Sequence, residues 1–456
     1  MLNHSMKGAV KYGLALVITM MLSMWLGWSK TSWSMLTVTV LAVLDTYGYS
    51  VKKGHDRLLG TVIGTAVAFL MIGLFVQQRA LFIASMTAFM WVCVYYQSHR
   101  RWAYTFNLAI TVCVIIGSAI SADSVSVIST AITRMQETIL GVVVFSVVYR
   151  LVWPSLTDEA YFSRLQSELN DLQSLSALLK NGEQDSDEIA KLLSRVKKSA
   201  ESLKELLSLP VEPNEYLFQH QKKLHSLTLL IDDAIKIASQ EASRDGTRGN
   251  PFHLGVLDEL LEELARFVQS RGESDITRST DAKLATLPAM LLPKEKRFYF
   301  ANIAACVMLT TFVLWIYMPV PMGVLFPTFA GIFAANVMAI PGKAVKYIML
   351  IYVGIAALLI LQYVFIMPAM SEAWQILALY FVNAVFLFGL CDLLKVGALK
   401  ALAGNVLVNV PSSAVERVPN YNILSPLNLL VVLCLSLLII EFYAKVFSIK
   451  ATQTGS

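Results

Sequence analysis

Charge is scarce over most of this sequence, and what there is lies mainly in one stretch. Only 15% of the 456 residues are Asp, Glu, Lys or Arg, whereas 56% are hydrophobic. Well over half of the charged residues fall between Ser155 and Lys296, and the rest of the chain carries a small basic excess. Such an excess is typical of loops between membrane spans, so we expect no nucleic-acid partner.

Reactive motifs are also missing. The five cysteines lie in apolar segments without Cys-x-x-Cys spacing or nearby histidines, which predicts neither a disulfide nor a metal site. The sequence has no glycine-rich nucleotide-binding loop and no plausible set of nucleophile, base and orienting group. We therefore expect a protein that is not an enzyme, needs no cofactor and does not use ATP.

Long apolar runs are what the sequence has in abundance, since a helix needs about 20 apolar residues to cross a hydrocarbon core. Six runs are expected at 9–28, 32–49, 57–76, 79–97, 102–121 and 134–153, and six more at 298–318, 321–340, 345–367, 372–391, 394–411 and 425–448. Polar residues interrupt the eleventh, which predicts a broken or cavity-lining helix. No small-x-small cleavage site follows the first run, so we expect a retained helix rather than a signal peptide.

Basic residues favour alternate connections between these runs. One side carries Lys7, Lys11, Lys52, Lys53, Arg57, Arg100, Arg101, Lys294, Lys296, Arg297, Lys343, Lys346, Lys395, Lys445 and Lys450, and the other carries Lys30, Arg79, Arg134 and Arg417. By the positive-inside rule we expect both termini and the charged stretch to be cytoplasmic. The halves 1–154 and 297–456 then share one orientation, which predicts an all-α membrane protein of two parallel six-helix repeats. Aligning them on Arg57 and Lys346 brings further identical residues into register, which supports a duplication.

The stretch 155–296 is helical in its pattern. Apolar residues at three- or four-residue steps predict helices at about 157–181, 185–209, 213–243 and 253–271. We expect these helices to form a bundle on the cytoplasmic face. Its densest acidic cluster, around Asp258 and Glu262, is expected to be a solvated face rather than a binding patch.

Polar groups inside apolar runs are the candidate transport residues, because burying a charge in hydrocarbon is costly. Asp45 is either an interfacial ion-pair partner of the basic residues 52–57 or a carboxylate that carries protons. Arg134 and Glu137 lie three residues apart, so they either neutralise each other or leave Arg134 to bind an anion. Lys400 either attracts an anion or extends to the interface. Gly60 and Gly64 form a GxxxG face that predicts close helix packing.

The first half resembles the fusaric acid resistance family of inner-membrane efflux proteins, which includes aromatic carboxylic acid exporters. The matching residues are Trp33 with Leu36-Thr37-Val38, the hinge Lys53-Gly54 followed by Arg57, Gly60-Thr61 and Gly64, then Tyr104 and Asn107, and finally Arg134, Glu137, Gly141 and Trp153-Pro154.

This resemblance implies proton-driven export of small organic anions across the bacterial inner membrane, with a periplasmic adaptor and a homodimer as expected partners. We expect Tyr104, Asn107, Arg134 and Lys400 to bind the substrate, and Asp45 and Glu137 to carry protons. Two other functions stay open. Plant malate-type anion channels also have six spans before a helical cytoplasmic region, which allows a passive channel. A scaffold that moves no substrate is the third possibility.

Overall fold

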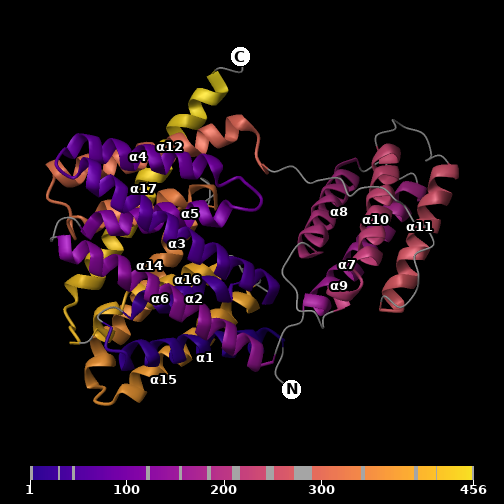
Figure 1. Ribbon diagram of the computed structural model, residues 1–456. Coiled ribbons are helices and arrows are strands. Elements are labelled where there is room, and N and C mark those ends of the chain that lie inside the picture. The colour runs from indigo at the N-terminus through magenta and orange to yellow at the C-terminus, as the bar shows by residue number, and fades with distance from the viewer. Residues whose placement is uncertain are drawn as a thin grey trace. The chain divides into compact units, whose positions relative to one another are not determined.

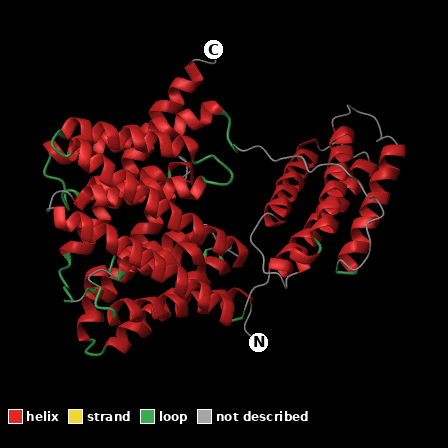
Figure 2. Ribbon diagram, in the orientation of Figure 1, coloured by secondary structure: helices red, strands yellow, loops and turns green. Residues whose placement is uncertain are grey.

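In the computed structural model the described residues form helices joined by loops and turns, with an isolated β-bridge between His99 and Met290 (Figure 2). The described residues are 4–28, 31–43, 47–119, 124–153, 157–181, 186–207, 216–242, 251–271, 290–339, 345–394, 399–416 and 418–453. The chain divides into two compact units. The first contains Met1–Val43, Lys53–Trp153 and Pro288–Ser456, and the second contains Leu44–Lys52 and Pro154–Leu287.

The helices of the first unit come from both ends of the chain. Before the charged stretch these are α1 (His4–Trp25), α2 (Ser32–Ala42), α3 (Tyr47–Phe75), α4 (Arg79–Tyr96), α5 (Ala103–Ser118) and α6 (Ser124–Leu151). After it come α12 (Lys294–Tyr317), α13 (Leu325–Ala335), α14 (Val345–Phe365), α15 (Ala373–Leu393), α16 (Leu399–Asn409) and α17 (Leu424–Gln453), with short 3₁₀ turns at Val337–Ala339, Met367–Ala369 and Ser412–Val415.

Eight of the described helices are long and apolar enough to cross a membrane, namely α1, α3, α4, α6, α12, α14, α15 and α17. The other four are shorter: α2, α13 and α16 have 11 residues each, and α5 has 16. A helix of 11 residues rises only about 16 Å, roughly half of a hydrocarbon core. The sequence-based expectation of full-length runs is therefore wrong at α2 and α13, whereas the short α16 lies in the eleventh run, where a broken helix is expected.

Two expected boundaries also differ from the structure. Residues 47–57, expected to hold the end of one run and a basic hinge, belong to the continuous helix α3, and α6 begins at Ser124 rather than 134. Lys and Arg are good helix formers, so a drop in hydropathy does not end a helix. Gly54 opens space for a neighbour instead of a turn, because an added Cβ would lie 3.2 Å from the Val142 side chain.

The short helices form the interior of the first unit. Most side chains of α2, α5 and α13 are buried, whereas the long helices bury between 22% and 50% of their most apolar windows. Those long helices expose large apolar side chains such as Leu70, Leu350 and Phe386. Since helix ends inside hydrocarbon need protein or a cavity around them, the short helices are the places to look for a site.

Contacts between the two ends of the chain follow a regular pattern. Helix α1 packs on α15, and α12 packs on α4 (Figure 1). In the same way α2 packs on α16, and α13 packs on α5. The first helix of each half therefore meets the fourth of the other, and the second meets the fifth.

The second unit contains a helical bundle. Its helices are α7 (Thr157–Asn181), α8 (Ser186–Leu207), α9 (Tyr216–Gln219), α10 (Gln221–Ala242) and α11 (Pro251–Gln269). The expected helix over 213–243 is divided, because a turn at His220 separates α9 from α10. Helices α7 and α10 each pack on both α8 and α11 around a leucine-rich core. Asp258 of the acidic cluster pairs with Lys180 at 2.6 Å, so it serves packing between α11 and α7.

Candidate functional site

Two buried arginines meet one face of the short helix α2. Arg134 of α6 lies over the Trp33 ring, with Cζ 3.5 Å from the ring centroid. Arg57 of α3 donates from Nε to Thr37 Oγ1 at 3.2 Å. Trp33 and Thr37 are four residues apart and therefore share a helical face. The two arginines are only 8% and 7% exposed, so their charges depend on nearby groups for stabilisation.

The partners of the two arginines differ in charge. Arg134 Nη1 donates to Glu137 Oε2 at 3.2 Å, and Glu137 is 1% exposed. Arg57 Nη1 donates to the Tyr104 hydroxyl at 2.7 Å. Both described groups that Arg57 binds are thus neutral hydroxyls, which orient its charge without cancelling it.

A third cation, Lys53, lies one turn before Arg57. Its Nζ is 4.9 Å from the Tyr104 ring centroid and 3.5 Å from the Val40 carbonyl oxygen. The aromatic face and the carbonyl stabilise this ammonium group, again without a full negative charge. The cluster of Lys53, Arg57 and Arg134 is therefore electropositive, which suits an anion.

Glycines hold this cluster tightly together. A Cβ added at Gly141 of α6 would lie 2.6 Å from Thr37 Cβ, so α6 and α2 are in backbone-level contact. A Cβ at Gly64 would lie 2.4 Å from the Ala109 carbonyl oxygen, and one at Gly60 would lie 2.9 Å from Leu108 Cβ. The GxxxG face of α3 thus packs directly on α5.

Arg134 and Trp33 line a cavity of about 350 Å³ that is shared by both halves of the chain. Other polar groups on its wall are Thr31, Ser32, Ser118, Thr130, Thr328, Asn409, Ser412, Ser413, Glu416 and Ser425. They come from the starts of α2, α6, α13 and α17, from the ends of α5 and α16, and from the 3₁₀ turn Ser412–Val415 with the residue that follows it. A guanidinium group surrounded by hydroxyls and an amide can bind a carboxylate, while Glu416 adds one opposing charge. We call this space the Arg134 cavity.

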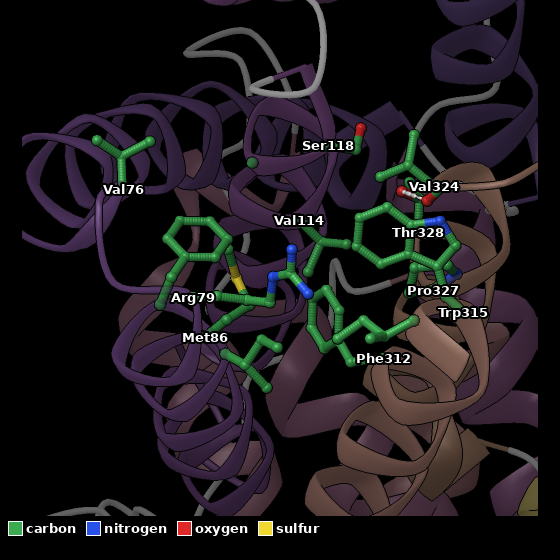
Figure 3. Close-up of a pocket in the computed structure, with 14 residues that line it drawn as sticks. Val76, Arg79, Met86, Val114, Ser118, Phe312, Trp315, Val324, Pro327 and Thr328 are labelled. Carbon is green, nitrogen blue, oxygen red and sulfur yellow. Dashed lines mark hydrogen bonds between the residues drawn. The ribbon is translucent and has the colours of Figure 1, made fainter.

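A second cavity, of about 440 Å³, has a different character (Figure 3). Its wall is mainly apolar and aromatic, with Phe82, Phe312 and Trp315, and it contains one charged side chain, Arg79. Ser118, Val324 and Thr328 line both cavities. We call it the Arg79 cavity.

The remaining predicted residues lie in other surroundings. Asn107 Nδ2 donates to Asn336 Oδ1 at 2.9 Å and to the Ala335 carbonyl at 3.1 Å, which ties α5 to α13. Lys400 Nζ pairs with Asp392 at 2.6 Å, so its charge is balanced. Neither Asn107 nor Lys400 lines the Arg134 cavity. Asp45 lies outside the described residues.

Sequence reasoning missed two contributors to these cavities. Arg79 was grouped only with the basic residues of the weakly charged side, although an arginine at the edge of an apolar run is itself a signal. Thr328 carries no local motif that would assign it to a site, whereas Asn409, which also lines the Arg134 cavity, is one of the polar residues that interrupt the eleventh run. Within the described residues, no group of three or more His, Cys, Asp or Glu side chains is placed to hold a metal ion.

Comparison with known proteins agrees with this architecture. The profile of the fusaric acid resistance protein family matches residues 7–302, from α1 through the bundle into α12. No curated protein is detectably similar to the chain. The eight span-length helices and the family match indicate a multi-pass membrane protein with a transport function related to efflux. The match covers more than half of the chain, which therefore belongs to the fusaric acid resistance protein family.

Proposed function

We propose that the protein is a secondary transporter that exports small aromatic carboxylic acids through the Arg134 cavity. The observation that carries this proposal is a buried arginine, aligned on the short helix α2, in a cavity built by both halves of the chain. Family membership supports transport, and the arginine supports an acidic substrate.

The arrangement of short helices supports a two-repeat transporter. Helices α2 and α13 are second in their halves, α5 and α16 are fifth, and the contacts between halves follow the same correspondence. Short apolar segments at matching positions of two repeats point to a binding site at the repeat interface. A rocking motion of one half against the other would then expose the cavity to each side in turn.

Glu137 gives the site a way to respond to protons. Its carboxylate and the carboxylate of a substrate compete for the Arg134 guanidinium group, so protonation of Glu137 favours binding of the acid. Proton and anion therefore reinforce each other at this pair. Export driven by inward proton movement needs a further carboxylate that exchanges its proton in the substrate-free step, and Asp45 is our candidate.

The inside-negative membrane potential adds a second driving force. Each exported monoanion carries one negative charge out of the inside-negative cytoplasm, in whichever protonation state Glu137 is. Moving one such charge outward gains about 2.3 kcal/mol per 100 mV.

We place the termini and the bundle in the cytoplasm and propose a homodimer that works with a periplasmic adaptor.

Transport by proteoliposomes tests this proposal. Vesicles that contain the purified protein would be loaded with a panel of aromatic carboxylates, and efflux would be measured with a pH gradient while the membrane potential is clamped at zero. Accumulation against a concentration gradient is the expected result. Flux that only runs downhill would identify a passive channel instead, and no flux with any acid would favour a scaffold.

A further inference from the structure

The Arg79 cavity is built from helix ends that lie on one side of the first unit. It lies between the ends of α3, α5 and α12 and the starts of α4 and α13. Figure 3 shows the Arg79 guanidinium group directed into this space, toward Val114 and Phe312. Phe312 and Trp315, with ring centroids 6.3 Å apart, form part of the wall.

Arg79 is exposed at the start of α4, and no described residue compensates its charge. Among the described residues, Arg79 forms no hydrogen bond and no ion pair, unlike Arg134, which pairs with Glu137. Few other donors remain in the cavity. The Thr328 hydroxyl already donates to the Val324 carbonyl at 2.9 Å, and the Ser118 hydroxyl donates to the Ile115 carbonyl at 2.6 Å.

The indole N–H of Trp315 is another donor in this wall for which no acceptor is described. No described acceptor is hydrogen-bonded to it, and the ring lines the same cavity as Arg79. A ligand that complements the side chains of this wall has one negative charge and a flat apolar body. The single cation binds the charge, and the rings of Phe82, Phe312 and Trp315 bind the body.

The position of the cavity connects it to the Arg134 cavity. Ser118, Val324 and Thr328 belong to the walls of both, so one layer of side chains separates the two spaces. Val324 and Thr328 are one helical turn apart at the start of α13. A small displacement of this end of α13 would join the cavities.

We infer that the Arg79 cavity is a second binding site for an aromatic monocarboxylate, which receives the acid from the Arg134 cavity through the wall formed by Ser118, Val324 and Thr328. This inference rests on the proposed function, since it extends the path of the same substrate. The positive-inside rule assigns the basic residues at the start of α3 to the cytoplasmic side. The cavity lies at the opposite ends of the helices, and thus on the periplasmic side. It therefore serves as an exit vestibule.

Equilibrium binding to the full-length protein tests this inference. The protein would be placed in nanodiscs of zwitterionic lipid and titrated with 1-naphthoate. We expect two sites per chain in the wild type. Arg79→Gln should remove one site or weaken it about tenfold or more, as expected for loss of a charge-assisted hydrogen bond. Arg134→Gln should affect the other site.

Matched controls test separately the position of the arginine, the aromatic ring of the ligand and the indole ring of Trp315. Arg101→Gln removes an exposed arginine that lies 4.9 Å from the Trp102 ring outside the cavity, and it should retain both sites. Cyclohexanecarboxylate has the charge without the aromatic ring and should bind the Arg79 site at least several-fold more weakly. Trp315→Phe should weaken naphthoate binding at that site and remove part of the quenching of tryptophan fluorescence by the ligand.

Each outcome decides between the alternatives. Unchanged stoichiometry and affinity in both Arg79→Gln and Trp315→Phe would overturn the inference. Loss of the Arg79-dependent site on addition of anionic lipid, without competition at the other site, would assign the cavity to a lipid headgroup and also overturn it. Export that proceeds normally in Arg79→Gln refutes the vestibule but leaves the proposed function intact. Naphthoate binding at Arg79 without any export refutes the function but leaves the site.

Discussion

The guanidinium group of Arg134 lies over the indole ring of Trp33, with Cζ 3.5 Å from the ring centroid, and thereby joins α6 to the short helix α2. The stack fixes the plane of the guanidinium group, while Glu137 takes a hydrogen bond from Nη1 at 3.2 Å. A lysine could keep the charge but neither the plane nor the paired donors. The geometry thus makes arginine specifically suited to this position.

Arg134→Lys should consequently raise the apparent substrate constant for export about tenfold or more, because bidentate binding is lost. Trp33→Leu should raise the same constant by a smaller factor, since it removes a desolvated cation–π contact of about 2 kcal/mol that orients the arginine. The measurement is the concentration dependence of initial efflux from proteoliposomes. Arg101→Lys is the control, and equal constants in all four proteins would show that Arg134 has only a structural role.

Much of this architecture could be predicted from the sequence, but not which helices are too short to cross the membrane. A spacing of three residues suffices to bring Arg134 and Glu137 within reach, and leucine periodicity suffices for α7 and α8. Hydropathy depends on composition and does not show where a helix ends. The apolar residues around α2 and α13 therefore predict full-length spans, although each helix has only 11 residues. The short lengths of α2 and α13 therefore could not be predicted, whereas polar residues did indicate the interruption at α16.

The contacts between distant segments were also beyond the sequence. The hydrogen bond from Arg57 to Tyr104 links residues 47 positions apart, and the Arg134 cavity draws Asn409 and Ser412 from the other half. No local pattern encodes such meetings, because they depend on how α2 and α5 pack on α16 and α13. Asn107, predicted from its place in an apolar run, ties α5 to α13, and this contact across the chain could not be predicted from the sequence either.

Arg134 and Glu137 should show strong energetic coupling. Removing one partner leaves the other charge buried, which costs about 3 kcal/mol or more, whereas removing both avoids that penalty. We expect Arg134→Gln and Glu137→Gln each to lower the thermal unfolding midpoint in detergent, and the double variant to be more stable than the sum of both losses predicts.

The pair of Lys445 and Glu441, in which the lysine is exposed and the glutamate is buried, provides a comparison for that cycle. Its nitrogen and oxygen are 2.6 Å apart, but the lysine side chain is 66% exposed, so the coupling should be weaker than that of Arg134 and Glu137. Additive losses at Arg134 and Glu137 would mean that water or another group compensates each charge, and the competition proposed for substrate binding would lose its basis.

Gly64 should tolerate no side chain. An added Cβ would lie 2.4 Å from the Ala109 carbonyl oxygen, and a backbone atom cannot move aside as a flexible side chain can. We expect Gly64→Ala to destabilise the protein by about 1–3 kcal/mol. Gly73→Ala on the same helix α3 is the matched control, because nothing lies within 4 Å of its added Cβ. Similar unfolding midpoints for the two variants would refute close packing of α3 on α5.

Glu168 should make the stability of the bundle depend on pH. Burial raises the pKa of this carboxyl from 4.5 to about 7, and the nearby Ser199 hydroxyl only partly offsets that effect. A folded-state pKa above the unfolded value adds stability below pH 4.5 that is lost as the pH rises through 7. From pH 5 to pH 8 the bundle should lose roughly 2–3 kcal/mol through this group.

Hydrogen exchange of α7, α8 and α10 in the full-length protein, corrected for the intrinsic pH dependence of exchange, measures this loss. Glu168→Gln should abolish it and slow exchange at pH 8, because the amide remains neutral at both pH values. Glu201→Gln, at an exposed position of α8, should leave the pH dependence as in the wild type. If Glu168→Gln instead retained the full difference between pH 5 and pH 8, the titrating group would have to be another residue.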